Sequence, residues 1–218
     1  MMRRETLLAA LQWALIGLGA MLAVWCAVTI VETHYVQSMP IPSARTALPG
    51  DWSNGGYPRG AIAAGTWLAR LDAPSVHLSA TVLEGSDDRT LSRAAGHLEE
   101  TPRPGERGNV AIAGHRDTIF RPLRDLHAGD RLTLTTADRV YWYRVASTNI
   151  VEPDDVRVLE ARNRPTLTLV TCYPFTFIGQ APQRYVVSAD LVGEELRGPR
   201  DGNPLRSGES GGPGKSGQ

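Results

Sequence analysis

The chain has 218 residues, with 23 Lys and Arg residues against 23 Asp and Glu residues, so its formal net charge is zero. A balanced charge supplies no basic field, and we therefore expect no nucleic-acid partner. The length fits one ordinary domain with additional segments. The 22 Gly and 15 Pro residues lie between short strand-like runs, which favours an all-β domain over a helical bundle.

The N-terminal segment predicts a membrane anchor. Residues 7–31 carry no formal charge, and a helix over them would be about 37 Å long, enough to cross a bilayer core of about 30 Å. Arg3 and Arg4 precede the run and Glu32 follows it, so the positive-inside bias predicts cytoplasmic residues 1–6 and an extracytoplasmic domain. We expect a single-pass signal-anchor in the cell membrane. The competing interpretation is a cleaved signal peptide, whose apolar core would be only about 7–15 residues long and precede a small-residue cleavage site.

Two further segments flank the expected domain. Residues 32–59 are rich in Pro and Gly and poor in aliphatic residues, which predicts an irregular extracytoplasmic linker. Residues 196–218 consist of Gly, Ser and Pro with scattered charges, a composition that buries too little surface to order itself. We therefore expect a disordered tail there, and a folded domain over residues 60–195.

The domain contains mostly strand patterns. One helix is expected over 88–98, with Asp87 or Asp88 as its N-cap, and a helical turn at 123–126. Such a small share of helix favours a closed barrel or a sandwich. Strands are expected at 61–71, 76–83, 109–115, 131–136, 140–151, 166–172 and 184–192.

The strand that ends at Cys172 carries the first candidate for chemistry. It stops there because Pro174 cannot donate to a sheet ladder. The other cysteine, Cys26, lies in the apolar N-terminal run, so Cys172 has no partner within its own domain. A leftover thiol in an exported domain is a candidate nucleophile, although most free cysteines are small buried hydrophobes. Period-2 geometry places Thr168, Val170 and Cys172 on one face and Leu167, Leu169 and Thr171 on the other.

Two other polar residues lie at strand ends. His115 closes one expected strand and Arg184 opens another. The connection from Cys172 to Arg184 is short enough for antiparallel neighbours, which would place thiol and guanidinium at one edge. His115 would join them if its strand ran parallel to the cysteine strand, and the intervening chain is long enough for that crossover.

Together these side chains suit acyl transfer through a thioester. A thiolate attacks a carbonyl carbon, an imidazole moves the protons, and a guanidinium stabilises a developing oxyanion or holds a substrate backbone. Singly, each has a simpler explanation, since a strand-end His is usually a structural hydrogen-bonder and a strand-end Arg a solvated charge. We expect structural roles for His97 and His127 and a turn at Asp117. A Cys/His metal site is not expected, because no CxxC or HxxxH spacing is present.

The motifs around these residues resemble the sortases, most closely class D. They are 108–113, 114–118, 167–175 and 181–187, and the resemblance runs from about residue 60 to residue 192. It implies an eight-stranded β-barrel with one or two short helices and a groove floored by strands. It also implies a cysteine transpeptidase that cleaves a Leu-Pro-x-Thr-Gly-like sorting signal in client proteins. The client then passes to an amine acceptor, a cell-wall peptide or a pilin lysine, in the cell envelope or pilus.

The resemblance assigns roles by motif. Cys172 would be the nucleophile that forms the acyl-enzyme, His115 the general acid and base, and Arg184 the stabiliser of the oxyanion or the substrate backbone. Thr171 would border the groove and support substrate binding. Two alternatives stay open beside the transpeptidase: a protease-like hydrolase with water as acceptor, and a non-catalytic membrane-tethered barrel that binds an envelope partner.

No cofactor is expected. Some sortases bind calcium through carboxylates ahead of the cysteine strand, and Glu152, Asp154 and Asp155 lie in that region. Beside Pro153, these acidic residues are more simply explained as a turn.

Overall fold

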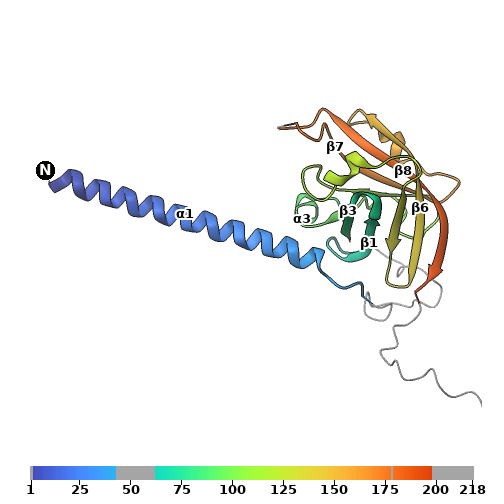
Figure 1. Cartoon of the computed structure of the whole chain (residues 1–218), viewed down its shortest axis with the longest axis horizontal. Coiled ribbons are helices and arrows are strands. Elements are labelled where there is room, and N and C mark those ends of the chain that lie inside the picture. The colour runs from blue at the N-terminus through green and yellow to red at the C-terminus, as the bar shows by residue number, and fades with distance from the viewer. Residues whose placement is uncertain (1, 43–61, 178, 198–218) are drawn as a thin grey trace, which may run out of the picture.

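The computed structural model describes residues 2–42, 62–177 and 179–197. In these residues a long N-terminal helix precedes eight strands that close into a barrel (Figure 1). The prediction of an all-β barrel behind an apolar helix is confirmed. The predicted linker beyond residue 42, the first residue of the strand expected at 61–71, and the tail beyond residue 197 lie outside the described residues.

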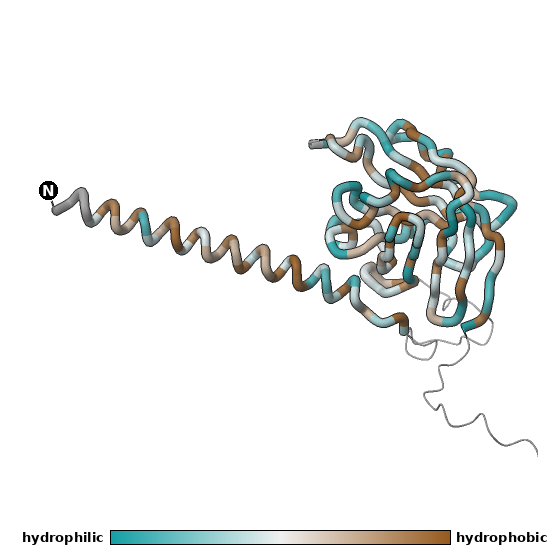
Figure 2. The backbone as a smooth tube through the Cα atoms, in the orientation of Figure 1, coloured by the Kyte–Doolittle hydropathy of each residue, from teal (hydrophilic) through white to brown (hydrophobic). Residues whose placement is uncertain are grey.

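The N-terminal helix, α1 (Met2–Gln37), extends past the apolar run at both ends. Within the described residues it is the one helix that is long and apolar enough to cross a membrane, by length and composition, over Thr6–Gln37. Figure 2 shows apolar residues along most of its length, on a rod that projects away from the barrel. Its apolar side chains are exposed because no protein surrounds them, as expected for a helix whose partner is lipid.

The strands follow the predicted pattern closely. Around the barrel their order is β1-β2-β3-β4-β7-β8-β6-β5. Alternate side chains point inward, and the interior is filled by aliphatic residues, with Leu71, Ile112, Leu134 and Leu169 all fully buried. The bounds are β1 Trp67–Ala73, β2 Leu78–Glu84, β3 Ala95–His97, β4 Asn109–Ala113, β5 Arg131–Thr135, β6 Arg139–Val151, β7 Thr166–Tyr173 and β8 Gln183–Leu196.

The prediction of a helix over 88–98 is wrong in its second half. The helix α3 (Asp88–Leu91) ends after one turn, and the chain then enters β3. β3 lies between β2 and β4, parallel to the first and antiparallel to the second. Gly96 permits this close approach, because a Cβ there would overlap the backbone oxygen of Gly85. Pairing on both edges outweighs the local preference for helix.

A buried polar network holds the end of β3. His97 Nδ1 lies 3.0 Å from Glu84 Oε2, and its Nε2 lies 3.0 Å from the oxygen of Pro102 and 3.2 Å from Thr101 Oγ1. The Thr101 hydroxyl donates to the oxygen of Leu98, so Nε2 of His97 is the donor toward both of its neighbours. His97 has the structural role that the sequence suggested.

Two strand starts are also corrected. The strand expected at 61–71 begins at Trp67, because residues 63–66 form a turn in which Gly65 has φ +81°. The strand expected at 76–83 begins at Leu78, after a single 3-10 turn, η1 (Pro74–Val76).

Two further 3-10 turns lie between the later strands. The helical turn expected at 123–126 is η2 (Arg121–Asp125), and η3 (Val156–Leu159) was not expected.

The last turn of α1 packs on the barrel next to α3 (Figure 1). Val36 is buried against Leu83 and Ala94, and Trp67 of β1 covers the contact. An ion pair between Glu32 and Arg93, 3.1 Å apart, lies one turn earlier.

Hydrogen bonds complete this junction. The Gln37 amide donates to the oxygen of Arg93 (2.8 Å) and accepts from the backbone N–H of Thr81 (3.0 Å). The carbonyl oxygen of Gln37 accepts from the Arg70 guanidinium, and that of Val36 accepts from the Thr81 hydroxyl. Carbonyls that a helix end leaves free are thus satisfied by barrel side chains. We call these five residues, Val36, Gln37, Arg70, Thr81 and Arg93, the docking seam.

Candidate active site

The register of three neighbouring strands aligns the predicted site residues. β4 runs parallel to β7, and β7 runs antiparallel to β8, as the sequence suggested. One row of aligned residues on the outer face is Ala113, Val170 and Val186. Because side chains alternate between faces, the next row on that face is two residues further along each strand pair. That row is His115, Cys172 and Arg184, which we call the catalytic row.

Direct contacts support this alignment. Cys172 and Arg184 are paired across β7 and β8. β4 ends at Ala113, so His115 lies in the loop beyond it and not in the strand as expected. The backbone N–H of Gly114 still donates to the oxygen of Val170 at 3.2 Å, which continues the parallel ladder to the residue before His115.

The catalytic row opens into one cavity of about 540 Å³. Cys172 is a free cysteine with a half-buried side chain, and His115 is exposed. The structure therefore brings the three predicted residues together in a place that a substrate can enter. The lining residues are His115, Arg116, Asp117, Pro153, Cys172, Gly179, Gln180, Ala181 and Arg184.

The Arg184 guanidinium is held where β8 begins. It donates through Nη1 to the oxygens of Gln183 (3.0 Å) and Ala181 (3.3 Å). These bonds restrict the guanidinium, and Arg184 is the strand partner of Cys172 and lines the same cavity. A cation fixed next to a thiol can stabilise negative charge that develops during an attack on a carbonyl.

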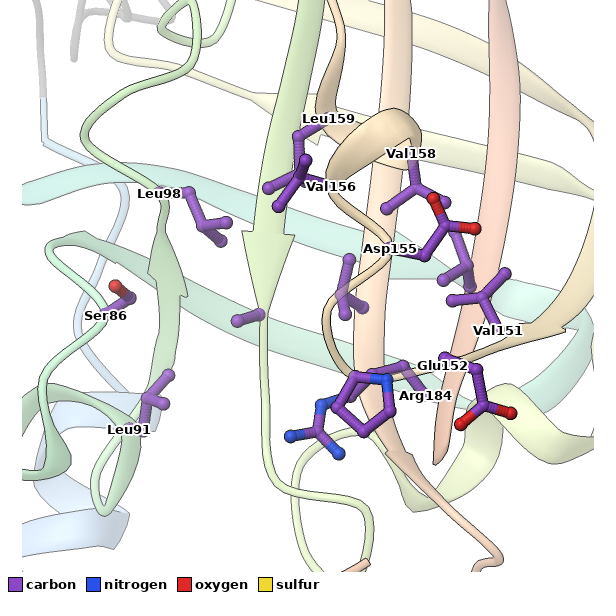
Figure 3. A pocket seen from close by; sticks show the side chains of 14 residues that line it. Ser86, Leu91, Leu98, Val151, Glu152, Asp155, Val156, Val158, Leu159 and Arg184 are labelled. Atoms are coloured by element: carbon purple, nitrogen blue, oxygen red, sulfur yellow. The ribbon is translucent and has the colours of Figure 1, made fainter. Parts of the chain in front are cut away.

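A second, mostly apolar cavity of about 240 Å³ shares Arg184 and Pro153 with the first. Its floor is the row Ala113, Val170 and Val186. Figure 3 shows Ser86, Leu91 and Leu98 along one side and the side chains of η3 along the other, with Arg184 near one end. The cavity therefore suits an aliphatic side chain that belongs to the same ligand as the group at Cys172.

The η3 wall of this cavity is attached to the barrel. Asn109 Nδ2 donates to the oxygen of Val158 at 2.9 Å, and Asn109 Oδ1 accepts from the Thr168 hydroxyl at 2.6 Å. Asn109 and Thr168 are both fully buried beneath η3. These bonds hold the wall at a fixed distance from the floor.

Thr171 does not border the groove. It lines neither cavity, and its side chain is 3% exposed on the inner face, opposite that of Cys172. Its hydroxyl donates to the oxygen of Gly114 at 2.6 Å. The expected substrate-binding role is therefore not supported by its position, and Thr171 instead ties the cysteine strand to the residue before His115. The period-2 pattern had already placed it on the opposite face from Cys172.

Gly114 sits where a side chain has no room. A Cβ at this position would lie 2.7 Å from the ring of Phe120, which is fully buried. The backbone N–H of Phe120 also donates to the oxygen of His115 at 2.9 Å. The loop that carries His115 is therefore wrapped closely around one core aromatic ring.

The sequence reasoning missed Arg116. Its Nη2 donates to the oxygens of Phe177 (2.7 Å) and Gly179 (3.0 Å), in the loop that joins β7 to β8. Its Nη1 is buried and has no hydrogen-bond partner in the described part of the chain. The one feature of the sequence that could have pointed to Arg116 was its position immediately after His115. Asp117, which follows, is an exposed residue at the same cavity.

Two of the three carboxylates ahead of β7, those of Glu152 and Asp155, have protein partners. Glu152 accepts from the Gln183 amide at 3.2 Å. Both oxygens of Asp155 accept from the Arg157 guanidinium at 2.8 Å, and this bonding holds the pKa of Asp155 below its ordinary value. No three His, Cys, Asp or Glu residues are grouped to hold a metal ion within ranges 2–42, 62–177 and 179–197. The arrangement offers no ready-made calcium site around Glu152, Asp154 and Asp155, and the expectation that the protein needs no cofactor stays a prediction.

Comparison with known proteins finds a matching family and several similar proteins. The family described as Sortase domain matches residues 71–192. The chain is 35% identical over 123 residues to Sortase D of Bacillus subtilis (strain 168), covering 56% of this chain and 62% of that protein. It is 32% identical over 134 residues to Sortase A of Bacillus anthracis, covering 60% and 62%. The chain therefore matches less than two thirds of the length of each of these curated relatives.

Solved structures share the barrel. A Clostridium perfringens Sortase D5 transpeptidase superposes with a TM-score of 0.56 at 33% identity, over 61% of this chain and 83% of that one. The SrtA sortase from Actinomyces oris superposes with a TM-score of 0.57 at 27% identity, over 69% and 94%. The similarity covers the domain that contains the catalytic row.

Proposed function

The chain belongs to the sortase family, and we propose that it is a membrane-anchored cysteine transpeptidase of the class D type. The observation that carries the proposal is the alignment of His115, Cys172 and Arg184 on one outer face, open to one cavity. We propose that its substrates are client proteins with a Leu-Pro-x-Thr-Gly-like sorting signal near their C-terminus.

Substrate binding would use both cavities. An aliphatic side chain of the signal enters the apolar cavity, between Leu98 and the η3 wall. The peptide backbone then runs past Arg184, which lines both cavities, and brings the scissile carbonyl to Cys172. Binding at a distance from the reacting bond fixes the carbonyl in position for attack.

Acylation follows. The Cys172 thiolate attacks the carbonyl carbon and forms a tetrahedral intermediate, whose oxyanion is stabilised by the Arg184 guanidinium. The carbon–nitrogen bond breaks, and His115 donates a proton to the departing amine. The products are a thioester between Cys172 and the client, and a released C-terminal fragment.

Transfer reverses these roles. An incoming amine loses a proton to His115 as its nitrogen attacks the thioester carbonyl. The carbon–sulfur bond breaks, the new amide leaves, and the Cys172 sulfur is freed for another cycle. The acceptor would be a cell-wall peptide or a pilin lysine.

We further propose the cell membrane as the location, with α1 as a single span. Residues 1–6 would be cytoplasmic and the barrel extracytoplasmic, because Arg3 and Arg4 precede the apolar run. The docking seam would then hold the barrel close to the extracytoplasmic surface of the cell membrane.

Hydrolysis is the second candidate, because the cavity is open and His115 is exposed, so water can reach the thioester. Adding an amine and measuring the ligated product against the hydrolysed one separates the two. A product that stays entirely hydrolysed at saturating amine would favour the hydrolase.

The test uses the full chain in detergent or lipid nanodiscs with a labelled Leu-Pro-x-Thr-Gly peptide and a small amine. Mass spectrometry should detect the peptide acyl group on Cys172, and Cys172→Ala should lower turnover by more than about 10³-fold without lowering the melting temperature. No metal enters the proposed mechanism, so turnover should be equal with chelator or with calcium. Retained cleavage in Cys172→Ala, or no acyl adduct in a folded wild type, would support the non-catalytic binding module instead.

A further inference from the structure

The position of His115 is determined by its neighbours and not by its own side chain. The imidazole makes no hydrogen bond in the described part of the chain, and β4 has already ended at Ala113. On one side, the backbone N–H and oxygen of Gly114 bond to Val170 and Thr171 of β7. On the other side, the residue that follows is Arg116. A catalytic imidazole in such a loop is oriented only if both flanking residues are fixed.

Arg116 supplies the second of these attachments. Its Nη2 binds two backbone oxygens, those of Phe177 and Gly179, in the loop between β7 and β8 (residues 174–182). That loop begins two residues after Cys172 and ends two residues before Arg184. Within the described residues, no other hydrogen bond connects it to a segment outside its own two strands. One side chain thus links the loop of His115 to the loop that joins the other two members of the catalytic row.

The same loop forms part of the cavity wall. Gly179, Gln180 and Ala181 line the cavity beside Cys172, and Phe177, earlier in the same loop, is 45% exposed. Gly179 has φ +101°, a conformation suited to glycine, so its carbonyl can turn toward the guanidinium. Losing the Arg116 bonds would therefore release the His115 loop and this wall together.

The unpartnered Nη1 of Arg116 argues that the guanidinium is there for more than local stability. A buried donor without an acceptor is unfavourable, and a methionine or leucine would fill the space without that penalty. No carboxylate is paired with the guanidinium in the described residues, although Asp117 is its neighbour in sequence. The guanidinium lies where its two hydrogen bonds fix the backbone of the β7–β8 loop close to Cys172.

We propose that Arg116 is a positioning residue for transpeptidation, which holds His115 and the β7–β8 loop in the arrangement that the reaction needs. This inference rests on the proposed function, because it assigns a role to Arg116 within that reaction. It predicts that the chemical step, and not substrate binding alone, depends on the guanidinium.

The test compares Arg116→Met, which keeps the length of the side chain without its donors, with Arg116→Lys, which keeps a cation able to donate to carbonyls. Arg131→Met is the matched control, since Arg131 is an exposed residue of β5 whose side chain makes no hydrogen bond or ion pair with the described residues. In full-length protein, we expect Arg116→Met to lower kcat about 100-fold while KM changes less than about threefold. Arg116→Lys should recover about tenfold of that loss, and Arg131→Met should match wild type.

A second measurement separates this inference from the proposed function. Alkylation of Cys172 by iodoacetamide, read by mass spectrometry at that residue so that Cys26 does not contribute, should be no slower in Arg116→Met than in wild type, because release of the wall leaves the thiol in place and opens the cavity beside it. Wild-type protein that forms no acyl-enzyme would overturn the proposed function. An Arg116→Met protein with the wild-type kcat, or equal losses in Arg116→Lys and Arg116→Met, would overturn the positioning role. If Arg116→Met does not fold, Arg116→Gln is judged by the same criteria.

Discussion

The docking seam, where α1 meets the barrel, and the catalytic row differ in packing and in hydrogen bonding. At the docking seam, Val36 is 6% exposed, and Gln37 exchanges hydrogen bonds with three barrel residues. At the catalytic row, His115 is exposed and without a hydrogen bond in the described residues, and the nearby Arg116 keeps one buried donor unpaired. One region is closely packed and satisfied, whereas the other is open and incompletely satisfied.

The difference indicates a division of work within one fold. Satisfied, buried contacts contribute stability, while groups that must bind substrate are left partly unsatisfied. We therefore expect changes at the docking seam to alter stability with little effect on turnover, and changes near the catalytic row to do the reverse.

Among the variants that test this comparison, Gly114→Ala should have the largest effect. In Gly114→Ala the new Cβ, 2.7 Å from the Phe120 ring, must push the His115 loop outward, and a shift of about 1 Å at a reacting group can lower kcat by about 10²-fold. The variant should stay folded, with a melting temperature lowered by the crowding of the added methyl group against the buried Phe120 ring. Steady-state kinetics and thermal unfolding of the same preparation measure both.

A double variant sharpens this result. Phe120→Leu makes room for the added methyl group, so Gly114→Ala with Phe120→Leu should recover part of the lost kcat even though Phe120→Leu alone lowers stability. No recovery would mean that the ring contact is not what displaces His115.

A smaller effect is expected at the docking seam. Gln37→Ala removes two side-chain hydrogen bonds to the barrel, to Arg93 and Thr81, and should lower the unfolding free energy by about 1–3 kcal/mol. Gln37→Glu keeps the acceptor for the Thr81 N–H and loses the donor, so it should fall between Gln37→Ala and wild type. Urea unfolding in detergent gives the stability, and kcat should be unchanged in both variants. A loss of kcat at unchanged stability would contradict the division of work.

Much of the catalytic row could be predicted from the sequence. Cys172 and Arg184 are close in the chain, so a short antiparallel connection left little choice of register. The face of each side chain on β7 also followed from alternation, including the inward position of Thr171. Local pattern and short connections decide such features.

The parts that could not be predicted depend on partners far along the chain. β3 forms because Gly96 fits against Gly85 and because His97 finds Glu84, and neither contact is visible in a window of helix-forming residues. The acceptors of Arg116 are backbone oxygens in an irregular loop, a kind of partner that residue types do not reveal.

The smallest expected effect concerns the barrel interior, which supports both regions. Tyr143 of β6 is 2% exposed, and its burial raises the pKa of its phenol above the ordinary value. Burial and the nearby Asp138 raise the pKa of Tyr141 to about 12. In the unfolded chain both phenols ionise near pH 10, so above that pH the folded state retains protons that the unfolded state loses.

These two tyrosines should therefore not lower the free energy of unfolding below about pH 10. Above that pH it should decline by up to about 1.4 kcal/mol per pH unit for each tyrosine that stays protonated in the folded state. Tyr143→Phe removes one of the two contributions, so its unfolding free energy should fall less steeply between about pH 10 and 11.5. Urea unfolding at a series of pH values measures the slope, with the exposed Tyr35→Phe as the control. Ionisation of these tyrosines would destabilise the barrel that supports both regions. The docking seam and the catalytic row should therefore unfold in one transition. Loss of turnover at a lower pH than unfolding would show instead that the catalytic row opens independently of the barrel.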